Sequence, residues 1–433
     1  MKGRYLNLAA SGAALCLTAV TLTGCGAVGG LTGDNEVTLR VVAADYGDNP
    51  QNSSATYWKD LADSFEKAHP DIRVEVSVYS WSEVDAKVAE MVKAGKAPDI
   101  AQIGAYADYA ADDKLYSVDE LLSVKTEADF LGPLADAGKV NRVQYGMPFV
   151  ASTRLLFYNE KLFADAGIVP KDGKTPWQPK SWAELEAAAK KLKAAGVQTP
   201  LALPLGREEA QAETMMWMLA GGGGYTDNEE AYSIDSADNI KTLEFLRDKM
   251  VGQGLTGPVE PGKLDRQAAF DAFTRGEVGM LNGHPTLLKQ AAGKGVKFGM
   301  VTLPTSDGTE HSAMGVADWM MAFKTGHKAE SGAFLDYVYE AKNVTAFTNA
   351  YDLLPVTTSG YRAVQSGTGG SAPQLKTFLA ALPNARLYPV GKKSWAGVSE
   401  DIKQDIGKTV QPGGQPAKVL EDIATAARAA DPR

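Results

Sequence analysis

The sequence predicts an α/β fold with more than one domain, and three observations lead to that class. Apolar runs typical of strands alternate with segments of helical spacing in the first third of the chain. The 433 residues are 44% hydrophobic and 22% charged, which is typical of a globular protein with a sizeable core. At about 150 residues per domain, this length allows two or three domains.

The first elements follow from the spacing of apolar residues. Trp58, Leu61 and Phe65 fall on one face of a helix that Pro70 ends. Consecutive strands joined by helices favour a parallel sheet covered by helices. In chain order the pattern predicts a strand over 37–43, a helix over 55–69, a strand over 72–79, a helix over 82–94 and a strand over 98–103.

Further elements follow a turn-flanked strand over 143–149 that leads into 155–158. Ser181 and Glu184 form a capping box, which predicts a helix that runs to about Ala195 and ends at Gly196. The same reasoning predicts helices over 209–219, 236–251, 264–275, 329–340, 394–408 and 417–430, and short strands over 276–281 and 297–303.

The N-terminus predicts export from the cytoplasm. Lys2 and Arg4 precede an apolar run over 8–23 that is too short for a comfortable membrane span. The run ends in Leu-Thr-Gly-Cys25, which resembles the lipobox of bacterial lipoproteins. That resemblance implies cleavage after a signal peptide (1–24), a diacylglycerol on Cys25 and a flexible Gly-rich tether over 25–36. An ordinary secretory signal with an incidental cysteine is the alternative.

The cysteine count bears on disulfide bonds, and the net charge bears on the kind of partner. The chain has two cysteines, Cys16 and Cys25, so no disulfide remains once the signal leaves and Cys25 is acylated. The net charge of -9 becomes -11 when Lys2 and Arg4 are removed. Because nucleic acids and anionic membrane faces require basic patches, we expect neither as a partner.

Several local motifs, in this order, resemble the extracellular solute-binding proteins of ABC importers, in the carbohydrate-binding group that includes maltose-binding protein. The resemblance covers nearly the whole mature chain. Its motifs are Phe-Glu-Lys-Ala-His-Pro (65–70), Ala-Gly-Lys-Ala-Pro-Asp-Ile (94–100), Gly-Met-Pro-Phe (146–149), Leu-Phe-Tyr-Asn (156–159), Ser-Trp (181–182), Gly-Glu-Val-Gly-Met (276–280) and Leu-Pro (303–304).

The resemblance implies a two-lobed periplasmic-binding-protein-like α/β fold with a hinge and an interlobe cleft. The N-terminal lobe would comprise 37–147 plus 300–342, and the C-terminal lobe 148–299 plus 343–430, with crossings near 146–150, 297–303 and 341–345. The implied protein is an extracytoplasmic, lipid-anchored monomer without a cofactor. It would bind a sugar and deliver it to membrane permease subunits that a cytoplasmic ATPase drives.

Aromatic and planar polar side chains that follow strand ends are the first site candidates, because sugars offer both hydroxyls and apolar ring faces. Asp45 and Tyr46 follow the first strand, Trp81 the second and Tyr106 the third, and Ser152 follows the first crossing at a position of frequent ligand contact in the family. Ordinary loop chemistry is the alternative for Asp45 and Tyr46, and packing at a helix start for Trp81.

The second lobe adds four candidates. Glu213 and Trp217 are four residues apart and share one face of a helix, although a stripe of Met and Trp is also typical of a core. Asn282 and His284 stand where the family commonly has Gly followed by a bulky aromatic, so a polar contact replaces a stacking one.

Three more candidates come from the later part of the chain. Asp318 and Trp319 follow the return to the first lobe and suit a sugar clamp, with a capped helix start as the alternative. Trp395 begins a late helix where the family often offers a stacking tryptophan.

Other classes of function are weaker. The four histidines have no metal-binding spacing, and P-loop, GxSxG and GxGxxG patterns are absent from the sequence. We therefore expect neither a metal site nor an enzyme. A non-sugar ligand (a peptide, an amino acid or a polyol phosphate), a secreted carbohydrate-active enzyme with paired carboxylates, and an adhesin or sensor partner stay open.

Overall fold

The computed structural model describes residues 36–47, 49–170, 176–227, 230–309, 313–367, 373–382 and 385–431. Residues 36–433 form one compact unit. The predicted signal peptide, Cys25 and nearly all of the tether lie outside the described residues. Within the described ranges, no helix is both long enough and apolar enough to cross a membrane.

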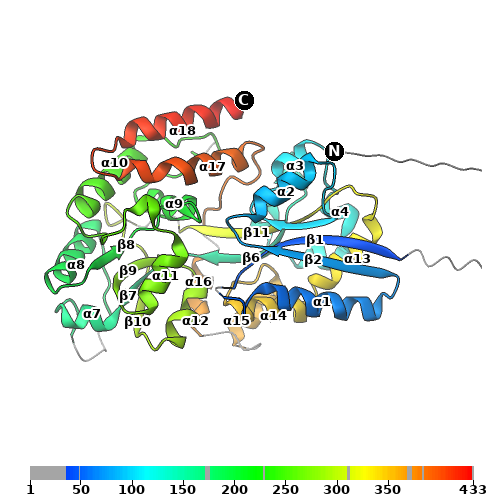
Figure 1. Ribbon diagram of the computed structural model, residues 1–433, viewed down its shortest axis with the longest axis horizontal. Helices are drawn as coiled ribbons and strands as arrows, with labels where there is room; N and C mark the ends of the chain where they lie inside the picture. Colours follow the sequence, from blue (N-terminus) through cyan, green and yellow to red (C-terminus); the bar gives the residue numbers. More distant parts are fainter. Residues whose placement is uncertain are drawn as a thin grey trace, which may run out of the picture. The chain divides into compact units, whose positions relative to one another are not determined.

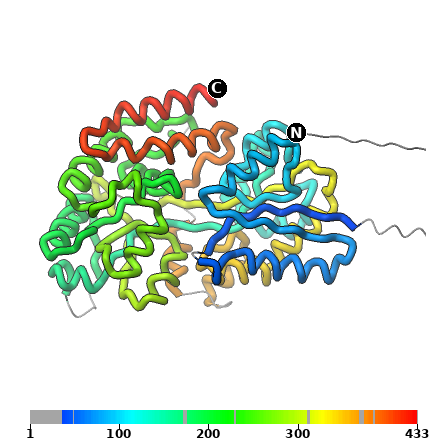
Figure 2. Tube along the Cα trace, viewed as in Figure 1, coloured from blue at the N-terminus to red at the C-terminus, as the bar shows by residue number. Residues whose placement is uncertain are grey.

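The first sheet has five strands, and the first three are parallel as predicted. β11 runs antiparallel to both of its neighbours, so the sheet is mixed, and the expectation of a parallel sheet is wrong for this strand. In Figure 2 the yellow segment that carries β11 returns among the blue and cyan strands. The order is β2 (Ile72–Tyr79), β1 (Val37–Ala44), β3 (Ile100–Ile103), β11 (Gly315–Ala322), β6 (Met147–Thr153).

Helices cover both faces of this sheet (Figure 1). On one face Trp58 and Phe65 of α1 pack as predicted, with Trp58 stacked on Phe149 and Phe347 beside them. All four of these side chains are buried. The helices on this face are α1 (Ser54–Ala68), α13 (Lys328–Val338) and α14 (Ala341–Tyr351), and those on the other are α2 (Val84–Lys93) and α3 (Ala107–Ala111).

The second sheet has four strands with its own helices. α8 (Trp182–Ala194), α9 (Ala210–Ala220) and α11 (Arg266–Thr274) are the predicted helices of this part, each within two residues of the expected bounds. The predicted helix over 236–251 is α10 (Ala237–Phe245) followed by a π-helical turn, Leu246–Val251. The strand order is β10 (Phe298–Val301), β7 (Leu155–Asn159), β9 (Val278–Gly283), β8 (Thr199–Ala202).

The remaining elements are short helices, two C-terminal helices and a small hairpin. α17 packs on α9, and α18 packs on α10 and α17. The elements are α4 (Val118–Leu121), α5 (Val124–Asp129), α6 (Gly132–Ala137), β4 (Lys139–Val140), β5 (Val143–Gln144), α7 (Glu160–Asp165), α12 (Thr286–Gly293), α15 (Thr358–Ser366), α16 (Leu375–Ala381), α17 (Trp395–Asp405) and α18 (Pro416–Ala430).

The chain passes between the sheets at residue 154 and again between β10 and β11, whereas the expected crossing near 341–345 coincides with the start of α14, which packs on the first sheet. β6 belongs to the first sheet and β7 to the second, and Arg154 alone separates them. The return runs through residues 302–314, between β10 and β11. The predicted residue bounds of the two lobes stay a prediction.

Candidate ligand-binding site

A cavity of about 450 Å³ lies at the edge of the first sheet where its parallel strands end. Asp45 and Tyr46 follow β1, Trp81 follows β2 and Gly104 follows β3, and all four line the cavity. Because β11 is antiparallel to β3, its N-terminal half reaches this same edge and contributes Asp318. Ligands of open α/β sheets bind at this kind of edge.

Seven of the twelve predicted ligand residues line the cavity, and five do not. The lining residues are Asp45, Tyr46, Trp81, Ser152, His284, Asp318 and Trp395. The residues outside the lining are Tyr106, Glu213, Trp217, Asn282 and Trp319.

Tyr46 and Asp318 form a connected pair on the first-sheet side. The Tyr46 hydroxyl donates to Asp318 Oδ2 at 2.8 Å and accepts from Gln102 Nε2 at 2.9 Å. The Tyr46 ring meets Trp81 edge to face, with centroids 5.5 Å apart. Burial raises the pKa of Asp318 to about 7, so this carboxyl changes charge near neutral pH.

The Asp45 carboxylate accepts hydrogen bonds from neighbouring residues of the protein. It accepts from Ser53 Oγ at 2.6 Å, from Ser54 N at 2.8 Å and from Gly47 N at 3.0 Å, just ahead of α1. Burial raises the pKa of Asp45, but these hydrogen bonds outweigh it and leave the pKa below its usual value. Asp45 therefore holds the loop after β1 in place and stays ionised.

An arginine–glutamate network forms the opposite wall. Arg154 pairs with Glu209, and Arg266 pairs with both Glu208 and Glu209. Glu208, Glu209 and Arg266 were missed by the sequence reasoning, which looked for aromatic and polar residues at strand ends. The acidic pair at the start of a predicted helix was the available signal.

His284 lies beside this network as a neutral side chain. Burial, together with the charges of Arg154 and Arg266, holds the pKa of His284 well below its usual value. Its Nδ1 shares a hydrogen bond with Thr286 Oγ1 at 2.8 Å. The expectation that His284 offers a polar group at this position is consistent with its place in the lining.

Two stacked rings complete the lining. Trp395 stacks on Tyr388 with centroids 5.2 Å apart and an interplanar angle of 28°. Trp395 lines the cavity but is only 2% exposed, so nearly all of its side chain is packed. Tyr388 was also missed from sequence, because no strand end or helix start marks it.

Tyr106 and Trp319 are both fully buried behind the cavity. Their rings lie 5.4 Å apart, and the Tyr106 hydroxyl donates to the Ala137 carbonyl. A Cβ on Gly146 would come within 2.6 Å of Tyr106 and 3.0 Å of Trp319, so the glycine makes room for both rings. Each ring therefore lies in the core and not in the lining of the cavity.

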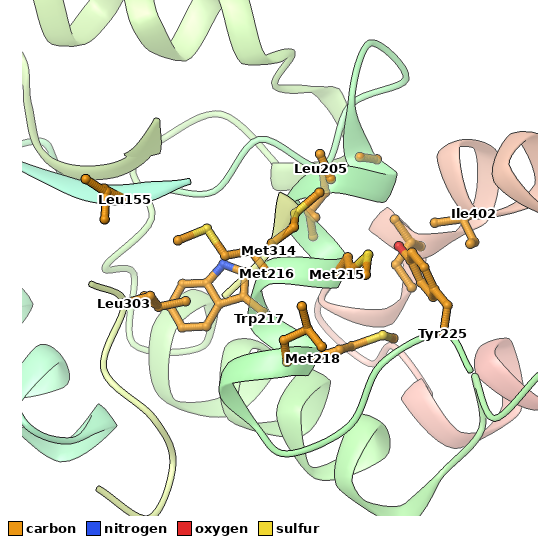
Figure 3. Packing of buried hydrophobic residues seen from close by; sticks show 14 of the residues in the cluster. Leu155, Leu205, Met215, Met216, Trp217, Met218, Tyr225, Leu303, Met314 and Ile402 are labelled. Carbon is orange, nitrogen blue, oxygen red and sulfur yellow. The ribbon is translucent and has the colours of Figure 1, made fainter. Parts of the chain in front are cut away.

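Glu213, Trp217 and Asn282 form a buried group in the second sheet's core. Glu213 Oε1 accepts from Trp217 Nε1 and from Asn282 Nδ2, both at 2.7 Å. Figure 3 shows the Trp217 indole among other buried apolar side chains, including Met216 and Leu303. Glu213 and Trp217 therefore lie in the core, which was the alternative stated for this stripe of Met and Trp.

No metal site is evident. Within the ranges that the structure describes, no group of three or more His, Cys, Asp or Glu residues is placed to hold a metal ion.

The family follows from the comparison with known sequences. Residues 49–345 match the family described as bacterial extracellular solute-binding protein. This stretch is more than half of the chain, and the protein belongs to that family.

Individual relatives are distant but span the chain. A binding protein of Brucella abortus is 26% identical over 407 residues, covering 90% of this chain and 92% of the relative. A lipoprotein of Streptomyces antibioticus is 25% identical over 89% of this chain and 84% of its own length. The sn-glycerol-3-phosphate-binding periplasmic protein UgpB of Pectobacterium atrosepticum is 23% identical over 70% of this chain and 71% of its own.

Solved structures with the same fold include sugar-binding proteins. The GacH receptor of Streptomyces glaucescens, solved unliganded and with acarbose, has a TM-score of 0.74 at 22% identity and covers 91% of this chain and 99% of its own. Maltose-bound MalE3 of T. maritima has a TM-score of 0.77 at 19% identity, over 90% of this chain and 99% of its own. An ABC substrate-binding protein of Listeria monocytogenes in complex with cycloalternan has a TM-score of 0.74 at 20% identity, over 91% and 98%. The chain therefore has the two-lobed fold of maltose-binding-protein-like proteins.

Proposed function

We propose that this protein binds an extracellular sugar, a di- or oligosaccharide, in the cavity and delivers it to the permease of an ABC importer. The observation that carries the proposal is the lining itself. Aromatic rings (Tyr46, Trp81, Tyr388, Trp395) stand beside planar polar groups in one cavity of about 450 Å³, a size typical of small-molecule sites. Rings cover the apolar faces of a sugar, and carboxylates and amides bind its hydroxyls.

The solved relatives support this ligand class. GacH was solved with acarbose, MalE3 with maltose and the Listeria protein with cycloalternan. Each of these ligands is a carbohydrate or a close analogue of one, and each protein has the fold of this chain.

The proposed mechanism is closure of the two lobes around the ligand. A sugar that contacts residues of both sheets stabilises the arrangement in which both walls reach it, and this shifts the population toward the closed form. The closed form then docks on the permease. In this proposal a diacylglycerol on Cys25 keeps the monomeric receptor at the outer face of the membrane, where it raises the local concentration at the permease.

A polyol phosphate is the second candidate, because UgpB relatives bind sn-glycerol 3-phosphate. The lining contains the cations that such a ligand would need, Arg154 and Arg266, but glutamates already engage both. The sugar therefore stays the first proposal.

The test is a ligand panel that reads melting temperature and tryptophan fluorescence. The panel contains maltose, trehalose, cellobiose, chitobiose, xylobiose, raffinose and simple hexoses, with amino acids, peptides and sn-glycerol 3-phosphate as controls. We expect a micromolar response from one class of sugar. A response only from a control compound would keep the fold and reject the sugar.

Anchoring has its own test. Mass spectrometry of the protein from a bacterial host should find a diacylglyceryl-modified Cys25 at the mature N-terminus. A Cys25→Ser variant should be released from the membrane fraction, and retention of this variant would reject the lipid anchor.

A further inference from the structure

The charges that line the cavity are unbalanced. Seven carboxylates face three cations: Asp45, Asp85, Asp108, Glu208, Glu209, Asp318 and Glu400 against Arg154, Arg266 and Lys403. The glutamates all have cationic partners, because Glu208 and Glu209 pair with the two arginines and Glu400 pairs with Arg207. The acidic groups without a cationic partner are therefore found among the aspartates.

Three of the aspartates form no ion pair with any residue that the structure describes. Asp318 accepts the Tyr46 hydroxyl, Asp85 accepts the Gly104 amide at 3.0 Å, and Asp108 Oδ1 is buried without a hydrogen bond. Lys403 interacts with Asp85 electrostatically but forms no salt bridge with it. Burial raises the pKa of all three carboxyls, because none has the close cation that would offset desolvation.

Four buried polar atoms of residues that line the cavity lack a hydrogen bond to the described residues. Gln211 Oε1 and Gln290 Oε1 are buried without a partner, as is Asp108 Oδ1, against one hydroxyl, that of Tyr388. His284 is 9% exposed, and its Nε2 has no hydrogen bond to the described residues. A buried polar group without a partner costs free energy, and three of these four atoms can only accept.

We propose that the cavity prefers a sugar that carries a protonated amino group, bound at the aspartates of the lining, over neutral and anionic sugars. This inference rests on the proposed function and names the ligand class for the same site. An ammonium group has three donors and no acceptor, so the carboxyls of the lining aspartates can accept hydrogen bonds from it. Its positive charge would also supply the ion pair that the aspartates lack.

The same charges disfavour an anionic ligand. A phosphate or carboxylate would enter a cavity in which negative groups outnumber positive ones and both arginines are engaged. Like charges in a partly desolvated site repel, and Lys403 is the one lining cation that forms no salt bridge with a described residue.

The experiment compares matched sugars by calorimetry and melting temperature. Each set contains a neutral sugar, its amino form and its phosphorylated form: glucose, glucosamine and glucose 6-phosphate; trehalose, 6-amino-6-deoxytrehalose and trehalose 6-phosphate; and maltose with the corresponding 6′-derivatives. In the set that binds, we expect the amino form to bind at least tenfold tighter than the neutral form. The phosphorylated form should give no response.

Two variants connect this preference to the aspartates. Asp318→Asn and Asp108→Asn should each reduce the ratio of the affinities for the amino and the neutral sugar by at least threefold. Asp63→Asn is the matched control, because Asp63 lies exposed on α1, paired with Lys59 and away from the cavity. Its ratio of affinities for the two sugars should equal that of the parent. If one cavity variant fails to fold, the other makes the same comparison.

The outcomes separate this inference from the proposed function. Equal or tighter binding of the neutral sugar would overturn the amino preference and leave sugar binding in place. Tighter binding of a phosphorylated sugar would do the same. No response from any set, with the sugar panel also silent, would overturn both.

Discussion

Burial sets the ionisation of single carboxyls around the cavity. The pKa of Asp318 is raised by burial from 3.8 to about 7, so the folded protein holds this proton more tightly than the unfolded chain does. Its stabilising effect is fully present below pH 3.8 and is lost as the pH rises through about 7. The charges that face it are those of Arg154, Glu209 and Asp85, and the Tyr46 hydroxyl bonds to it.

Asp318→Asn should therefore raise the melting temperature of the ligand-free protein at pH 8. The amide is neutral at every pH, so it avoids the cost of a buried charge. At pH 4 the difference should be small, because Asp318 is then protonated. Thermal unfolding followed by circular dichroism at both pH values measures this. A variant that is less stable than the parent at pH 8 would contradict the assigned cause.

Trp81 should be an aromatic contact for the sugar. It lines the cavity half-buried, with its ring edge on Tyr46. Trp81→Ala should weaken binding of the sugar found in the panel by more than tenfold, measured by calorimetry. Trp177→Ala is the control, because Trp177 packs on Tyr158 and Phe163 away from the cavity and should leave affinity unchanged.

Trp395 was also a stacking candidate from sequence, but it is unsuited to the same test. The side chain is 2% exposed and packs on Tyr388 and Tyr225. Trp395→Ala would remove core packing, at a typical cost of about 3–5 kcal/mol, along with any contact to a ligand.

Position at strand ends was a good guide to the cavity, and residue type was a poor one. Asp45, Tyr46 and Trp81 line it because parallel strands end at one edge. Tyr106 also follows a strand, but the space left by Gly146 lets its ring turn into the core. Contacts between distant residues, such as Arg266 with Glu208, leave no local pattern in the sequence.

At the scale of elements, local chemistry explains α8. The Glu184 amide donates to Ser181 Oγ at 3.4 Å, as the capping box predicts. Glu184 itself accepts from the Lys180 amide at 2.8 Å, one residue before the N-cap. The first hydrogen bond of the capping box therefore forms as predicted, and the second forms with the amide of the residue before the N-cap.

Ser181→Ala should destabilise the protein by about 1 kcal/mol, because the hydroxyl that caps α8 is lost. Urea unfolding would measure this loss as a lower free energy of unfolding, with an unchanged slope of that free energy against urea concentration. Ser181→Thr retains the hydroxyl and should keep most of the stability. Equal stability of the alanine and serine proteins would mean that the cap contributes nothing here.

The elements that sequence analysis located well are those with clear apolar periodicity. α1 and β2 begin within one residue of the expected positions. β11 was not predicted as a strand, because its sequence shows no regular alternation of apolar and polar residues and its last four residues are all buried. The direction of β11 is set by its partners β3 and β6, which lie far away in the sequence.

For the whole molecule, the proposal of lobe closure gives a change in size. Addition of the bound sugar should reduce the radius of gyration measured by small-angle X-ray scattering, because both walls then contact one ligand. Trp81→Ala at the same sugar concentration should show a smaller reduction. An unchanged radius with saturating ligand would reject closure and leave binding untouched.

Arg154 joins the two sheets and also lines the cavity, and this has a practical consequence. One covalent link between the sheets is a single residue whose guanidinium borders the space that a ligand would fill. Occupancy of that space and the angle between the sheets are thereby coupled at one position. A pair of fluorophores, one beside β2 and one on α18, would turn this coupling into an optical readout and make the chain a reagentless sensor for its ligand.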